Sequence, residues 1–112
     1  DIKLKDLPTA ISLCDFFFGN DGGPNHMAIG TGVPSLAIFA PFHLKEVWLP
    51  VDAPLHQGVD IKDAMNLDHA SFSAIEKDIK AHLGDYYRKI TPALVMQKLD
   101  EMLAKVLNKK NS

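Results

Sequence analysis

Three consecutive aromatic residues, a glycine-rich turn and a proline constrain the fold of this chain more than any other stretch. The aromatic run Phe16–Phe18 predicts a short strand, at about residues 15–19, that is buried on both faces. Glycines in the turn Gly19–Gly23 permit positive φ values and a close approach of the backbone to a ligand. Pro24 suits the first turn of a helix because it has no N–H to leave unpaired. The stretch therefore predicts a strand, a turn and a helix whose free N–H groups form an anion site.

A second apolar run follows closely and predicts a parallel sheet. The helix at about residues 24–30 is followed by a continuous apolar strand, Ser35–Phe39. A strand, a short helix and a strand within about 25 residues form a crossover connection, which makes the two strands parallel. Ligands bind at the carboxyl ends of the strands in such sheets. Both Asn20–Gly23 and Ala40–Phe42 are predicted to lie at that edge.

Capping signals and apolar spacing predict the remaining elements. The first is a helix capped by Asp6 that runs to about Cys14, and at most two turns of helix are expected before Pro50. Residues 51–70 are predicted to form a loop with one short strand near Val59–Ile61. A further helix is opened by the capping box Ser73–Glu76 and stopped by Gly84, and a last helix is capped by Thr91 with Pro92 at its first position. In the last helix an apolar stripe, expected to pack on the sheet, comprises Val95, Leu99, Met102, Leu103 and Val106.

Length, charge and composition narrow the class of protein. The 112 residues fit a single domain. The net charge of −2 and the lack of a basic stripe argue against a nucleic-acid partner. One cysteine, Cys14, cannot form an internal disulfide, which favours a reduced, cytoplasmic setting. No apolar run reaches the ~18 residues that span a bilayer. Because the chain begins with Asp1, we expect it to be a piece of a longer protein.

Two common nucleotide-binding motifs do not fit the glycine-rich stretches. A P-loop requires Gly-Lys followed by Ser or Thr, whereas Gly23 precedes Pro24 and Asn25. The dinucleotide fingerprint requires a third glycine, which Gly30–Ser35 lacks. Neither motif therefore explains the predicted anion site.

The stretch from residue 15 to residue 41 resembles the bacterial heptosyltransferases of lipopolysaccharide synthesis, which are inverting GT-B glycosyltransferases that use ADP-heptose. The resemblance lies in an apolar strand, a Gly-Asn-Asp turn, a short helix, a Gly-x-Pro turn and a second apolar strand that ends near a proline. The matching residues are Gly19-Asn20-Asp21, Gly23-Pro24, His26, Ala28, Gly32-Val33-Pro34 and Ser35 to Pro41. A weaker likeness to the family's closing helix begins at Ile90-Thr91-Pro92. Two positions depart from the pattern: Gly22 stands where the family usually has Ser or Thr, and Asn25 where it usually has an apolar residue.

The resemblance implies a fold and an activity. The fold would be α/β with a Rossmann-like parallel sheet, and residues 1–112 would be the later part of the C-terminal nucleotide-sugar domain of a GT-B enzyme. The implied activity is transfer of heptose from ADP-heptose to the lipopolysaccharide inner core, without a metal or other cofactor. The acceptor and the general base would belong to the absent N-terminal domain. No catalytic residue is therefore assigned in this chain, and we expect the fragment alone to be inactive. The full-length enzyme would work in the cytoplasm, at the inner face of the inner membrane.

Four residues are predicted to bind the donor substrate. The backbone amides of Gly22 and Gly23 would bind its diphosphate. His26, on the first turn of the helix, would donate to a phosphate oxygen, although an isolated histidine on a helix is more often structural. Asp21 has two interpretations, as the helix cap or as an acceptor for a sugar hydroxyl, and both can hold together. Direct contact of Asp21 with the diphosphate is excluded, because two negative charges repel each other.

Two other interpretations remain open at this stage. The chain could be a non-enzymatic module that binds phosphate or nucleotides, or the turn could be purely structural. A metal site at His26 is disfavoured because no second His or Cys lies at ligand spacing on the same helix.

Overall fold

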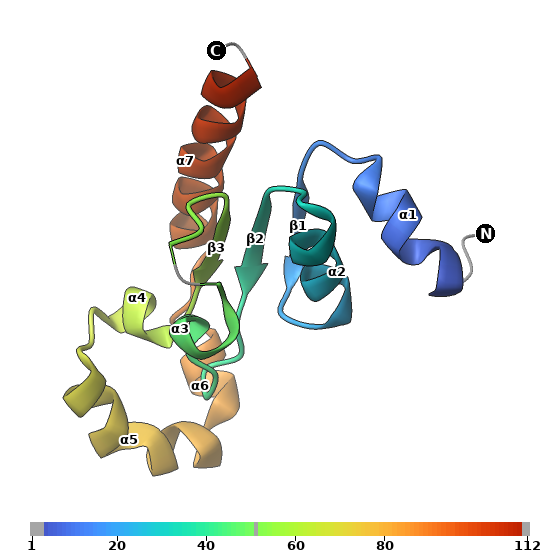
Figure 1. Cartoon of the computed structure of the whole chain (residues 1–112). Coiled ribbons are helices and arrows are strands. Elements are labelled where there is room, and N and C mark those ends of the chain that lie inside the picture. Colours follow the sequence, from blue (N-terminus) through green and yellow to red (C-terminus); the bar gives the residue numbers. More distant parts are fainter. Residues whose placement is uncertain (1–3, 51, 111–112) are drawn as a thin grey trace.

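The computed structural model describes residues 4–50 and 52–110 and contains one small parallel sheet. Its strands are β1 (Phe17–Asn20), β2 (Ser35–Ile38) and β3 (His56–Val59), in the spatial order β1-β2-β3 (Figure 1). Both neighbouring pairs are parallel, with Phe17 opposite Ser35 and Ser35 opposite His56. The predicted α/β class, the second strand and its parallel pairing with the first are confirmed.

Helices pack on the sheet and extend beyond its carboxyl edge. They are α1 (Leu7–Ser12, after a 3₁₀ turn at Leu4–Asp6), α2 (Gly23–Thr31), α3 (Lys45–Trp48), α4 (Ile61–Met65), α5 (His69–Ala81), α6 (Leu83–Tyr87) and α7 (Pro92–Lys110). α2 connects β1 to β2 and packs on both strands, whereas α7 packs on β2 and β3. In Figure 1, α5 and α6 form an arm beyond the ends of the strands, on the side where β2 points.

Three apolar clusters make up the core of the described chain. Leu36, Val59 and Met102 join the sheet to α7. A second cluster joins the arm to α4 and to the loop before α3, and comprises Leu44, Ile61, Phe72, Ile79 and Tyr86. The third joins α1 to α2 and comprises Ile11, Ala28 and Val33. The arm therefore packs around Leu44, close to the carboxyl end of β2.

The last helix forms as its sequence predicts. The Thr91 hydroxyl oxygen accepts a hydrogen bond from Leu94 N at 3.2 Å, which confirms the predicted cap. Val95, Met102 and Val106 are buried and Leu99 is half-buried, so the apolar stripe faces the protein. Leu103, at the border of the stripe, is 38% exposed.

The prediction that the first strand is buried on both faces is wrong. Side chains along β1 alternate between half-buried and exposed positions, and Phe18 is 44% exposed. β1 lies at one edge of the sheet, and α2 covers one of its faces. Because α7 packs on β2 and β3, the other face of β1 is not covered in the same way.

Helix boundaries in the arm also differ from the predicted ones. α5 begins at His69, four residues before Ser73, because the carboxylate of Asp68 accepts the Ser71 N–H at 2.7 Å and caps it. Gly84 lies inside α6 and does not end a helix. The predicted loop over 51–70 contains α4, which the sequence analysis missed, and its short strand lies at His56–Val59, earlier than predicted.

Asp6 precedes α1 as predicted but makes no side-chain hydrogen bond to it. Its backbone is helical, because the 3₁₀ turn leads directly into α1.

No helix among the described residues is both long enough and apolar enough to cross a bilayer.

Candidate functional site

The four predicted site residues lie between the carboxyl end of β1 and the first turn of α2. Asp21 N donates to Ile38 O at 2.9 Å, which extends the ladder between β1 and β2 by one residue. At Gly22 the chain turns into the helix with φ +156° and ψ −166°, a conformation that is open essentially to glycine alone. The turn therefore places Asp21 at the sheet edge and directs the start of α2 toward the same edge.

No side chain in the described part of the chain caps the first turn of α2. The N-cap residue is Gly22, which has no side chain that could accept a hydrogen bond from the first N–H groups of the helix. The interpretation of Asp21 as the helix cap is therefore wrong, because the chain turns one residue later than a cap at Asp21 would require. The first N–H groups of a helix have no intrahelical partner, so those at Gly22 and Gly23 can bind a ligand that carries negative charge.

The carboxylate of Asp21 is almost enclosed yet incompletely bonded. Its side chain is 14% exposed, and the atom Oδ1 is buried with no hydrogen-bond partner among the described residues. Two imidazoles flank it: His26 Nε2 lies 4.0 Å from Oδ1, and His43 Nδ1 lies 3.7 Å from Oδ2. Both distances are longer than the donor–acceptor distance of a hydrogen bond. An unpaired buried acceptor costs about 1–3 kcal/mol, so a donor at this position would be bound favourably.

Asn25 is a second polar side chain that lacks partners. It lies in the first turn of α2, is fully buried, and neither atom of its amide has a hydrogen-bond partner within the described residues. Buried polar groups are bonded in the great majority of cases. Asn25 is also one of the two positions that depart from the heptosyltransferase pattern. Two unsatisfied polar side chains thus lie within five residues at the start of one helix.

A hollow of about 300 Å³ opens beside Asp21 at the carboxyl edge of the sheet. It is lined by Asn20, Asp21, Ile38, Ala40, His43 and Tyr87. Of the four predicted site residues, Asp21 alone lines this hollow, while Gly22, Gly23 and His26 lie on the α2 side of Asp21. The structure thus separates a helix N-terminus, suited to an anion, from an adjoining hollow with a carboxylate in its wall.

His43 and Tyr87 are site residues that the sequence analysis missed. His43 follows β2, and its neighbours Ala40–Phe42 were predicted to lie at this edge, so the topology of the sheet already pointed to its position. Tyr87 is the last residue of α6, and nothing in its local sequence indicates that it approaches residues more than forty positions earlier.

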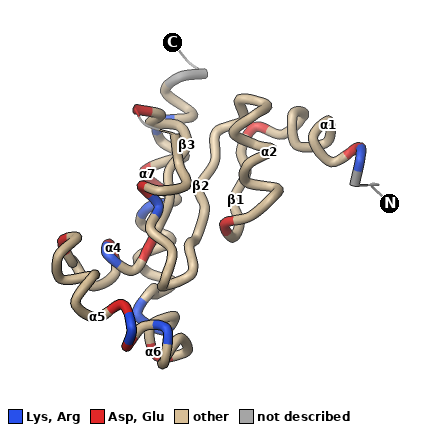
Figure 2. The backbone as a smooth tube through the Cα atoms, turned by 60° about the horizontal axis from the view of Figure 1, so that its bottom comes forward, with Lys and Arg blue, Asp and Glu red and all other residues tan. Residues whose placement is uncertain are grey.

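Positive charge is sparse in the sequence around the start of α2. Apart from histidines, the sequence between Leu7 and Leu44 has two charged side chains, Asp15 and Asp21. Figure 2 shows the backbone of β1 and α2 almost entirely in tan, whereas charges of both signs lie along α4, α5 and α6. The next cation in sequence, Lys45, binds both carboxylate oxygens of Asp63 at 2.7 Å. A phosphate at the start of α2 would therefore be bound by backbone N–H groups and His26.

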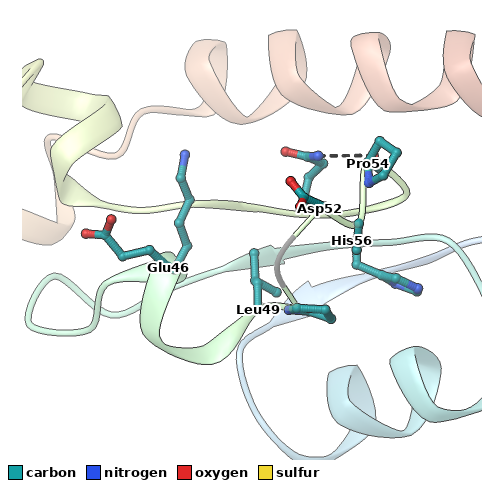
Figure 3. A pocket seen from close by; sticks show the side chains of 9 residues that line it. Glu46, Leu49, Asp52, Pro54 and His56 are labelled. Atoms are coloured by element: carbon teal, nitrogen blue, oxygen red, sulfur yellow. Dashed lines mark hydrogen bonds between the residues drawn. The ribbon is translucent and has the colours of Figure 1, made fainter.

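A larger hollow, of about 680 Å³, lies along α3 and the loop before β3 (Figure 3). It is mostly apolar, and its lining includes Leu49, Pro54 and His56. His56 Nδ1 lies 3.0 Å from the hydroxyl oxygen of Ser35, its partner in the sheet register. Ser35 is fully buried, so this Ser–His pair cannot present the hydroxyl to a substrate. The larger hollow also has polar side chains in its wall, among them Glu46, Asp52 and Gln57. The smaller hollow differs because it lies beside Asp21, whose carboxylate has a buried oxygen without a hydrogen-bond partner among the described residues.

The described residues contain no group of three or more His, Cys, Asp or Glu side chains arranged to hold a metal ion.

Comparison of the chain with models of protein families, with curated proteins and with solved structures finds no match. The functional interpretation of this site therefore depends on its chemistry and on the motif between residues 15 and 41.

Proposed function

We propose that this chain is the donor-binding part of an inverting GT-B glycosyltransferase that transfers heptose from ADP-heptose to the lipopolysaccharide inner core. The observation that carries the proposal is the juxtaposition of two binding groups at one edge of a parallel sheet. The first turn of α2 has no side-chain cap, and the adjacent Asp21 has a buried oxygen without a partner. These are the groups that a diphosphate and a sugar hydroxyl require.

In this proposal the diphosphate lies against the N-terminus of α2. The N–H groups of Gly22 and Gly23 donate to its oxygens, and the positive end of the helix dipole stabilises its charge. A Cβ at Gly23 would meet no atom within 4 Å, so the approach to its backbone is open. The diphosphate stays clear of the Asp21 carboxylate because like charges repel.

His26 supports the departure of ADP. Its side chain is 49% exposed at the start of α2, where an imidazole N–H can donate to the diphosphate. When an acceptor hydroxyl attacks the anomeric carbon, the bond between that carbon and the diphosphate oxygen breaks, and negative charge develops on the leaving group. A donor aimed at that charge stabilises the transition state. The proton of the acceptor hydroxyl passes to a base that this proposal places outside the chain.

Titration of the 112-residue chain with ADP and with ADP-heptose, followed by amide NMR, tests the proposal. We expect ADP to shift the amides of Gly22, Gly23 and His26, and ADP-heptose to shift that of Asp21 as well. The variant His26→Ala should weaken ADP binding about ten- to a hundredfold, the value of one hydrogen bond to a charged group. His82, an exposed histidine paired with Asp78 at 3.1 Å, provides the matched control His82→Ala, which should bind ADP normally.

Two results would contradict the proposal. If ADP leaves the three amides unshifted, the start of α2 is a purely structural turn. If inorganic diphosphate, ADP and ADP-heptose give the same shifts and the same affinity, the chain is a phosphate-binding module without recognition of the sugar.

A further inference from the structure

The hollow beside Asp21 has two aromatic walls, which come from separate parts of the chain. His43 follows β2, and Tyr87 ends α6. Both rings are partly accessible: the side chain of His43 is 37% exposed and Tyr87 is 48% exposed. The volume of about 300 Å³ lies at the lower end of the range for ligand pockets. The hollow therefore has room for one ring of a ligand but not for a whole nucleotide sugar.

The His43 ring is held in a defined orientation. The Phe42 ring meets it edge-on with 4.3 Å between centroids, and the Trp48 ring lies tilted against it at 5.6 Å. His43 Nδ1 faces the Asp21 carboxylate at 3.7 Å. Contacts on several sides restrict the ring, so it can act as a wall without losing much conformational freedom when a ligand binds.

Tyr87 is positioned by its neighbour. Tyr86 is buried, and its hydroxyl donates to the carboxylate of Asp78 on α5. This bond ties α6 to α5, and the ring of Tyr86 packs in the cluster around Leu44. The adjacent Tyr87 is consequently held at the rim of the hollow although its own side chain is half exposed.

We propose that His43 and Tyr87 are the walls of a sugar-ring subsite whose floor is Asp21. The chemistry of the lining fits a polyhydroxylated ring: the Asp21 carboxylate, whose Oδ2 lies 3.7 Å from His43 Nδ1 and so beyond hydrogen-bond distance, accepts from a ring hydroxyl, and the aromatic faces pack on the apolar C–H surface of the ring. This inference rests on the proposed function, because it places the heptose of the donor in the hollow while the diphosphate binds at α2. It assigns sugar specificity to two residues outside the motif of residues 15–41.

Affinities measured by calorimetry for ADP and for ADP-heptose test the inference. We expect His43→Ala and Tyr87→Ala to leave the Kd of ADP unchanged and to weaken ADP-heptose about three- to tenfold, the value of one or two ring contacts. Tyr87→Phe keeps the ring and should bind like the unmodified chain. Val47→Ala, which shortens the side chain of a 69% exposed residue of α3 that does not line the hollow, is the matched control. Equal melting temperatures would show that the variants fold.

A second measurement needs no variant. Free heptose should shift the NMR signals of the His43 and Tyr87 rings and should quench the fluorescence of Trp48, the single tryptophan of the chain, which lies against His43. If ADP fails to bind but free heptose still shifts both rings, the proposed function falls and the sugar subsite stands. If ADP-heptose binds and both alanine variants keep their preference for it over ADP, the subsite is wrong and the proposed function stands. An equal loss of affinity for both ligands would also overturn the inference, because the walls would then contact the nucleotide.

Discussion

At the scale of single residues, Asp21 has a side chain that the proposed function uses and that caps no helix. The side chain is almost enclosed, and its Oδ1 is buried without a partner among the described residues. The nearby imidazoles of His26 and His43 lie at 4.0 and 3.7 Å, beyond hydrogen-bond distance. Its substitution should therefore separate binding from stability.

We predict that Asp21→Asn keeps the melting temperature of the chain but weakens ADP-heptose more than ADP. Asparagine retains the shape of the side chain and removes the charge and one acceptor oxygen, and a hydrogen bond to a charged group is worth about ten- to a hundredfold in affinity. ADP has no heptose to lose contact with, so it serves as the internal control. An Asn variant with an unchanged preference for ADP-heptose would exclude Asp21 from the sugar site.

The second prediction at the scale of single residues concerns His56 and the pH dependence of stability. Burial lowers the pKa of His56, and its Nδ1 lies 3.0 Å from the buried Ser35 hydroxyl. Because the pKa is lower in the folded than in the unfolded chain, the unfolded chain binds the proton more strongly. The stabilisation is therefore complete above the unfolded pKa of about 6.5 and is lost as the pH falls below it.

Urea unfolding between about pH 8 and pH 5.5 checks this expectation. The free energy of unfolding of the unmodified chain should decrease as the pH is lowered. The decrease should be smaller in His56→Gln, whose side chain does not titrate. Identical pH dependence in the two proteins would show that His56 makes no contribution.

At the scale of elements, the turn from β1 to α2 depends on one glycine and not on its neighbour. Gly22 has φ +156°, whereas Gly23 has an ordinary helical position as the first residue of α2. We predict that Gly22→Ala destabilises the chain by about 1–3 kcal/mol, the cost of a strained backbone conformation. A Cβ at either glycine meets no atom within 4 Å, so steric contact does not differ between them.

The matched control is Gly23→Ala, which should change stability little. Thermal unfolding of the two variants measures the difference directly. If Gly22→Ala melts like Gly23→Ala, the turn adopts another conformation and the description of the α2 N-terminus is incorrect.

The connection between β3 and α4 depends on a reciprocal pair of carboxylates that the sequence analysis did not detect. Asp60 is buried; its carboxylate accepts the N–H of Lys45 at 3.0 Å and that of Asp63 at 3.1 Å. Asp63 in turn accepts the Asp60 N–H at 3.0 Å and binds the Lys45 ammonium. Burial raises the pKa of Asp60, and these hydrogen bonds offset part of the cost of enclosing its charge.

We predict that Asp60→Ala destabilises the chain by about 2–4 kcal/mol, because it leaves the N–H groups of Lys45 and Asp63 without their acceptor. Asp68→Ala removes a cap of the same residue type from the exposed start of α5 and should cost less. Chemical denaturation of both variants compares them. A loss for Asp60→Ala no larger than that for Asp68→Ala would mean that water satisfies the two groups.

At the scale of the whole molecule, the chain is less compact than its length suggests. Its radius of gyration is 15.1 Å, against about 13 Å expected for a globular domain of this length. The core is divided into three clusters, and the arm of α5 and α6 extends from the sheet (Figure 1). We therefore expect the free energy of unfolding to lie at or below the lower end of the usual 5–15 kcal/mol.

We predict that the 112-residue chain unfolds cooperatively and yet transfers no heptose. The described helices and strands share packed clusters, which supports cooperative unfolding, but the proposed site has groups for the donor and none assigned to the acceptor. Calorimetry and an assay with ADP-heptose and a lipopolysaccharide core acceptor check the two parts. Measurable transfer by the purified chain would overturn the assignment of the general base to another domain.

Local signals in the sequence determined the elements around the motif. Continuous apolar residues specify β2, Thr91 and Pro92 specify the start of α7, and the spacing of Val95, Met102 and Val106 specifies its buried face. The parallel pairing of β1 and β2 follows from the short crossover through α2. These features depend on residues close together in sequence, and local backbone preferences and apolar periodicity are sufficient to predict them.

Tertiary structure alone decided which side chains meet at the candidate site. Phe18 is exposed because α7 packs on β2 and β3, and a strand's position in its sheet is not encoded in its own residues. Asp21 resembles a cap by its position, but the backbone conformation of Gly22 moves the helix start by one residue. Tyr87 reaches the hollow because α5 and α6 fold back around Leu44. Long-range packing sets the outcomes for Phe18 and Tyr87, and no short stretch of sequence contains the residues that compete in it.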